Sequence, residues 1–181
     1  MPAPSNTIIW PSLKTYAGEK SSRVALPIGG IGTGTVSFCG HGAWRNWEVA
    51  NRPAKGFTPV GQGRAAPFFA LRTVSKGSDP VVRLLEGPNP ISEREGAEGA
   101  PLPNAGLPRF RKSNFHAAYP LGQLEFSDGD VPLAVQMQVF NPLIPGDSTQ
   151  SGLPVAMVRI KLRNDTATAV QASIAAALPN F

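Results

Sequence analysis

The chain has 181 residues, with 17 Lys and Arg against 12 Asp and Glu, which gives a formal net charge of +5. This length fits one domain, and 19 Gly with 19 Pro exclude a helical bundle, because Pro removes a helix donor and Gly weakens helix interiors. The single cysteine, Cys39, excludes an intrachain disulfide framework, and no stretch approaches the roughly 18 apolar residues of a membrane span.

The first unusual segment is the glycine-rich run 25–34, ALPIGGIGTG. It lacks the lysine of a phosphate-binding P-loop and the third-glycine spacing of a dinucleotide fingerprint, so neither nucleotide motif fits. Because Gly30, Gly32 and Gly34 alternate, we expect a strand with one face cleared of side chains that continues through 35–38. Such a face predicts the close approach of a loop, an aromatic ring or a second domain.

A segment rich in aromatic and hydrogen-bonding side chains follows, with Trp44, Arg45, Trp47, Glu48 and Asn51. Aromatic rings flanked by charged groups are typical of sugar-binding sites. Large aromatic residues more commonly fill a core or a domain interface. Both interpretations stay open at this point.

Residues that alternate between apolar and polar predict strands through the rest of the chain. The expected strands are 68–74 paired with 81–85, then 121–126 and 131–140. The intervening stretch 86–108 contains Gly, Pro and Glu without periodicity, which predicts a flexible loop.

Two further alternating runs, 155–163 and 170–178, flank the turn signal Asn164-Asp165. This arrangement predicts an antiparallel hairpin with one buried face. Because an unpaired apolar strand at the end of a sheet is a liability, and Phe181 comes three residues after this run, we expect a sandwich that is incomplete at its C-terminal end. The predicted fold is therefore all-β, an antiparallel β-sandwich or an open barrel.

Other observations narrow the function. His41 and His116 have no metal-type spacing, and no cofactor motif fits, so we expect neither a metal nor a cofactor. The first residues have no basic segment followed by an apolar one, so we expect no secretory signal and a cytoplasmic location.

Several motifs together resemble those of one family. They are LPIGGIGTG at 26–34, RNWEVAN at 45–51, Tyr119-Pro120, FNPLIPGD at 140–147, LPV at 153–155 and Arg163-Asn164. In order and spacing they are similar to the N-terminal domain of glycoside hydrolase family 116, which contains non-lysosomal glucosylceramidase and bacterial β-glucosidases. The resemblance covers about residues 16–181.

The resemblance implies that residues 1–181 are part of an N-terminal β-sandwich that packs on and supports a larger catalytic (α/α)6 barrel. Retaining hydrolysis of a β-glucosidic bond needs two carboxylates about 5 Å apart. The family carries both in the barrel, which this chain lacks, so we expect no catalytic residue here and contact with a glucoside or glycolipid only through that barrel. The candidates for the domain interface or the substrate entrance are Gly30, Gly32, Gly34, Trp44, Arg45, Trp47, Glu48 and Asn51.

The carboxylates of the chain itself form no persuasive buried pair. Three glutamates lie close together in the predicted loop 86–108. Two aspartates flank a glycine in a turn signal and are expected to cap that turn, and a third aspartate is expected to accept a hydrogen bond in a loop. In that order they are Glu93, Glu95 and Glu98, Asp128 and Asp130, and Asp147.

Two alternative functions belong to other classes. The first is a free-standing carbohydrate-binding module that uses Trp44, Trp47 and Arg45. The second is a polyanion-binding domain with two basic clusters, Arg159, Lys161 and Arg163 on one strand and Arg109, Arg111 and Lys112 elsewhere. A solvated outer sheet face explains the basic strand equally simply. The aromatic residues of a single-strand platform are missing, so we expect no nucleic-acid partner.

Overall fold

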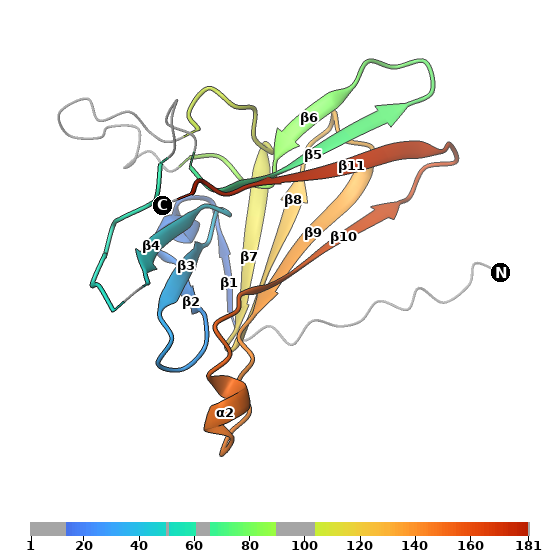
Figure 1. Cartoon of the computed structure of the whole chain (residues 1–181). Coiled ribbons are helices and arrows are strands. Elements are labelled where there is room, and N and C mark those ends of the chain that lie inside the picture. The colour runs from blue at the N-terminus through green and yellow to red at the C-terminus, as the bar shows by residue number, and fades with distance from the viewer. Residues whose placement is uncertain (1–13, 50, 61–65, 90–103, 181) are drawn as a thin grey trace.

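The computed structural model describes residues 14–49, 51–60, 66–89 and 104–180. Nearly all of the regular structure in them is β (Figure 1), and the strands form three antiparallel sheets that do not close into a barrel. The predicted all-β class is confirmed. No helix in the described ranges has the length and apolarity needed to span a bilayer.

The largest sheet has five strands in the order β1-β7-β8-β9-β10. They are β1 (Lys14–Ala17), β7 (Lys112–Ala118), β8 (Leu121–Ser127), β9 (Leu133–Phe140) and β10 (Met157–Asn164). Alternation sets the two faces, because Leu124 and Met137 point into the core while Glu125 and Gln136 lie on the other side. The predicted strands 121–126 and 131–140 are β8 and β9.

Two three-stranded sheets complete the fold, in the orders β11-β5-β6 and β2-β3-β4. The first contains β5 (Phe68–Ser75), β6 (Val81–Leu84) and β11 (Val170–Ala177), and the second contains β2 (Ala25–Ile28), β3 (Thr35–Cys39) and β4 (Trp44–Glu48). The predicted pairing of 68–74 with 81–85 is confirmed. A 3-10 turn, η1 (Gly18–Arg23), and a short helix, α2 (Ser148–Ser151), lie between strands.

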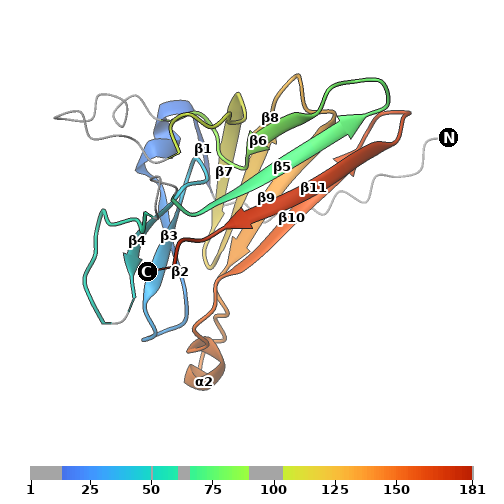
Figure 2. The same ribbon diagram turned by 45° about the horizontal axis from the view of Figure 1, so that its top comes forward.

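The predicted hairpin of 155–163 with 170–178 is wrong. Both runs are strands, but β10 pairs with β9 and β11 pairs with β5, so the turn after Asn164 carries the chain from one sheet to another. Figure 2 shows β10 and β11 running one over the other in separate layers. The alternating pattern is the same for a hairpin and for two facing edge strands, and therefore could not distinguish them.

One hydrophobic core lies between the sheets, with residues from all three. It includes Phe38 and Trp44 from the β2-β3-β4 sheet, Leu71 from β5, and Phe115 and Met137 from the five-stranded sheet. The strand β11 contributes little, since Ile174 is 45% exposed, so the predicted buried face of 170–178 is mostly open. Among the described strands, β11 pairs only with β5.

The loop between β2 and β3 and the segment that carries α2 lie at the same end of the molecule (Figure 1). These two connections contain most of the residues that carry the family resemblance. They define the end of the fold at which the candidate site is found.

Candidate functional site

The glycine-rich run 25–34 and the segment 141–155, which carries α2, are joined to each other. Asn141, at the start of the second segment, accepts a hydrogen bond from the Gly29 N–H (2.7 Å) through Oδ1 and donates one to the Pro27 carbonyl (2.8 Å) through Nδ2. The backbone N–H of Ile31 donates to the Ser151 carbonyl (2.8 Å). Residues far apart in the sequence therefore make one continuous surface.

The glycines allow close backbone contacts, but not as a strand. The β2 strand ends at Ile28, and a turn follows in which Gly32 and Gly34 have φ values of 74° and 92°. A Cβ on Gly30 would lie 2.3 Å from the Leu153 carbonyl oxygen, and one on Gly34 would lie 2.7 Å from the Glu48 carbonyl oxygen. The expected close approach is present, while the expected alternating strand is corrected to a turn, because glycine readily adopts positive φ.

The two tryptophans have different environments. Trp44 is 7% exposed and packs in the core against Phe38 and Phe69, with ring centroids 5.1 and 5.9 Å away. Trp47 is half-buried and lines an open apolar groove. The pair does not form an exposed aromatic platform, so an aromatic sugar site built on both rings has no support in this geometry.

That apolar groove, here called the edge groove, lies where the edges of the three sheets meet. It consists of two adjoining hollows of about 370 and 280 Å³. The shared lining residues are Trp44, Trp47, Ala156 and Leu178, and the remainder comes mainly from the glycine turn, β5 and residues 154–158. Its walls are almost wholly apolar, so the groove is better suited to packing against another apolar surface than to catalysing a reaction.

Glu48 and Asn51 lie in a separate, more polar hollow of about 540 Å³. Gly32 and Gly34 line it too, together with Arg52, and Glu48 accepts a hydrogen bond from the Ala54 N–H (3.3 Å). One carboxylate, one guanidinium and one amide can hold a polar group. The described lining holds no second carboxylate, so it cannot supply the pair that a retaining glycosidase needs.

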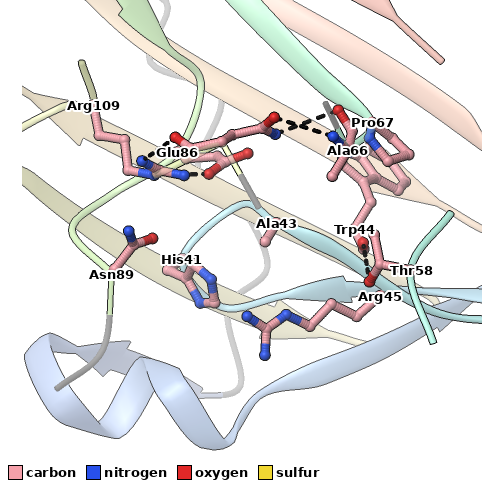
Figure 3. A pocket seen from close by; sticks show the side chains of 11 residues that line it. His41, Ala43, Trp44, Arg45, Thr58, Ala66, Pro67, Glu86, Asn89 and Arg109 are labelled. Atoms are coloured by element: carbon pink, nitrogen blue, oxygen red, sulfur yellow. Dashed lines mark hydrogen bonds and ion pairs between the residues drawn. The ribbon is translucent and has the colours of Figure 1, made fainter. Parts of the chain in front are cut away.

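Arg45 lines neither the edge groove nor this polar hollow, but a small polar pocket of about 30 Å³ (Figure 3). Glu86 and Arg109 form a nearly buried ion pair in it, with 2.9 Å between Nε and Oε2, and Figure 3 shows His41 between these residues and Arg45. No sequence pattern predicts this cluster, because its members come from separate loops and strands. The nearest signal is Glu86 itself, a lone acid directly after the apolar run 81–85.

Arg109 also ties the ends of the predicted loop 86–108 together. It donates to the Asn104 carbonyl (2.9 Å), and Phe110 N–H donates to the Glu86 carbonyl (3.0 Å). Residues 90–103, with Glu93, Glu95 and Glu98, lie outside the described residues. Arg109 and Arg111 each pair with a carboxylate, so two of the three cations of the second basic cluster are partly neutralised.

His41 makes the stability of the protein depend on pH. Burial, and then the nearby Arg45 and Arg109, lower its pKa from 6.5 to about 4. The unfolded chain therefore binds a proton more readily between these values, so stability is complete above pH 6.5 and falls as the pH is lowered toward 4. We expect a loss of about 2 kcal/mol between pH 6.5 and 5, measured by urea unfolding. His41→Gln should remove this slope, and an equal slope in the variant would contradict the assignment.

The remaining carboxylates have structural roles, as expected. Asp128 accepts the Asp130 N–H across the turn (3.0 Å), and both aspartates pair with Arg83. Burial raises the pKa of Asp128, but the Asp130 N–H and Arg83 outweigh it and lower the pKa overall. Asp147 accepts the Gln150 N–H (2.9 Å) as the cap of α2. Within the described ranges, no three acidic, histidine or cysteine side chains cluster as metal ligands do.

Comparison with known proteins gives one result for the family. A family model described as beta-glucosidase 2, glycosyl-hydrolase family 116 N-term matches residues 25–181. No curated protein matches the chain. The matched range includes both segments joined by Asn141 and every candidate site residue named from the sequence.

Proposed function

The chain belongs to the glycosyl-hydrolase family 116 N-terminal domain family, and we propose from this that it packs on and supports the catalytic domain of a retaining β-glucosidase or glucosylceramidase-like enzyme. The catalytic carboxylates would belong to that partner domain. The chain's own role would be to stabilise the partner and to shape one side of the substrate entrance.

One observation carries this proposal: the joined segments, together with Leu178 after β11, leave a strip of apolar side chains exposed beside the edge groove. Ile31, Leu153, Val155 and Leu178 are all exposed, and Val155 and Leu178 line the groove. Gly30 against Leu153 and Ile31 against Ser151 hold the strip in place. Contiguous apolar surface of this kind is typical of an interface with another domain.

The glycine turn and the hollow beside it suggest how an entrance is shaped. Glu48, Asn51 and Arg52 surround the turn and offer one acceptor, one amide and one cation. Such groups suit hydrogen bonds to sugar hydroxyls or to polar groups at the rim of a neighbouring domain. The family's β-glucosides are substrates of this polarity, and their hydrolysis is assigned to the partner domain alone.

Two valines of equal exposure provide the test. Val155 lies in the strip and is 43% exposed, whereas Val82 lies on β6 and is 42% exposed. In the protein made from the complete gene, we expect Val155→Asp to lower both the melting temperature and the hydrolysis of an aryl β-glucoside. Val82→Asp should leave both nearly unchanged, because exposed substitutions away from packing contacts usually cost less than about 0.5 kcal/mol.

The same two variants in the 181-residue chain alone separate docking from folding. Both should unfold at nearly the same temperature there, because each valine is exposed to solvent. Equal effects of the two substitutions in the complete protein would contradict docking through this strip. Absence of β-glucosidase activity in the complete wild-type protein would contradict the proposed reaction.

A further inference from the structure

The outer face of the five-stranded sheet carries two transverse rows of hydrogen-bonding side chains. Register places Thr15, His116, Gln123, Gln138 and Arg159 side by side across all five strands. The next row is Asn114, Glu125, Gln136 and Lys161, on β7 to β10. Residues between these positions along each strand point into the core, so both rows share the face that points away from it.

These side chains are held in place by hydrogen bonds to one another. Glu125 Oε1 accepts from Gln136 Nε2 (3.0 Å) and from Gln123 Nε2 (3.2 Å), and Gln123 Oε1 accepts from Gln138 Nε2 (2.6 Å). Thr15 Oγ1 and His116 Nδ1 are 3.0 Å apart, which extends the network to β1. Gln123, at the centre, is 3% exposed, so the network is packed as well as hydrogen-bonded.

An apolar row borders this network on one side. Register aligns Ala118, Leu121, Phe140 and Met157 across β7 to β10. Tyr119, in the turn between β7 and β8, is 59% exposed at the same end of the sheet. The face therefore has a wide amide-rich centre next to a half-exposed aromatic and aliphatic margin.

We propose that this face, here called the amide face, binds a neutral oligosaccharide chain laid across the strands. Sugar hydroxyls both donate and accept hydrogen bonds, as carboxamides do, and the C–H faces of sugar rings pack on aromatic and aliphatic side chains. Because the glutamines are already fixed by their neighbours, binding costs little side-chain entropy. This surface is distinct from the edge groove and the glycine turn, and it does not depend on the proposed partner domain.

The chemistry of the face disfavours other partners. Nucleic acids need a surface dominated by positive charge, but the carboxylate Glu125 lies among the amides of the central strands, and the cations stand at the margins, Lys112 at the start of β7 and Arg159 and Lys161 on the edge strand β10. The centre of a protein interface is usually apolar and aromatic, whereas the centre here is amide and carboxylate. A neutral polyhydroxyl ligand matches both features.

The test uses the 181-residue chain with cellohexaose, laminarihexaose and maltohexaose as separate probes. Two-dimensional ¹H–¹⁵N NMR follows the side-chain amide groups directly. At least one probe should shift the Gln136 and Gln138 side-chain signals in a saturable way, and the signal of the buried Gln123 through its hydrogen bond with Gln138. The double substitution Gln136→Ala and Gln138→Ala should weaken binding about thirtyfold, since two lost hydrogen bonds of about 1 kcal/mol each raise the Kd by that factor.

Gln171 supplies the matched control, because it is an exposed glutamine on β11, in another sheet. Its side-chain signal should not move, and Gln171→Ala should bind as the wild type does. Backbone amide spectra of the variants establish that the fold is kept, and Gln138→Glu alone serves if the double variant unfolds. The proposal would be overturned if none of the three probes bound, or if the wild type and the Gln136 and Gln138 variants bound with equal affinity. Binding only to a heparin oligosaccharide, to single-stranded DNA or to a protein would overturn it as well.

Discussion

Replacing Gly30 with alanine should destabilise the protein by about 3 kcal/mol, the upper end of the cost of overpacking a closed site. The new Cβ would lie 2.3 Å from the Leu153 carbonyl oxygen and 2.7 Å from the Gly152 carbonyl carbon. Both are backbone atoms, which cannot move aside as the end of a flexible side chain can. The glycine turn and the 141–155 segment would have to separate, and urea unfolding of the variant measures that cost.

Two other glycines separate crowding from backbone strain. Gly32 has open space around it but a φ of 74°, so Gly32→Ala should cost about 1 kcal/mol from strain alone. Gly106 has open space and no positive φ, so Gly106→Ala should be nearly neutral. If the three variants unfolded at the same urea concentration, close contact between the two segments would not be the reason why glycine is required at position 30.

Replacing Glu86 with glutamine should cost about 3 kcal/mol, because it leaves the Arg109 guanidinium buried without its carboxylate partner. The pair has side-chain exposures of 4% and 9%, and it ties β6 to the segment that enters β7. The double variant Glu86→Gln with Arg109→Met removes the uncompensated charge and should recover a large part of the loss. Thermal or urea unfolding of the single and double variants measures this coupling.

An exposed ion pair provides the comparison. Arg163 and Asp165 are bonded at 2.8 Å, but both side chains are mostly exposed to solvent. Asp165→Asn should therefore change stability far less than Glu86→Gln does, because solvent screens an exposed ion pair. A similar loss in Asp165→Asn and Glu86→Gln would show that burial does not govern the contribution of Glu86.

The sequence was most informative where local patterns decide the structure. The alternation in 131–140 was enough to place β9, and 68–74 was correctly paired with 81–85, because a short turn leaves neighbouring strands few alternatives. The same reasoning failed for β10 and β11. Their partners are set by which sheet has a free edge, and that depends on residues elsewhere in the chain.

The candidate site, too, could be predicted from the sequence only in part. Glycine content predicted close backbone contact, and Gly30 makes it, but only the fold shows that its partner is the 152–153 backbone. Trp44 turned out to belong to the core, whereas Trp47 reaches the edge groove, a difference that composition cannot reveal. The pocket of His41, Glu86 and Arg109 could not be predicted, because no spacing links residues from separate loops.

The crossing of the chain between sheets after β10 has a consequence for synthesis on the ribosome. The β5–β6 pair can form early. The other edge of β5 stays unpaired until residues 170–177 have emerged and β11 pairs with it, as Val170 does with Ser75. Such long-range pairing is slow, and the waiting edge can recruit another nascent chain. The demand on chaperones should therefore be greatest while the middle of the chain is complete and β11 is still inside the exit tunnel.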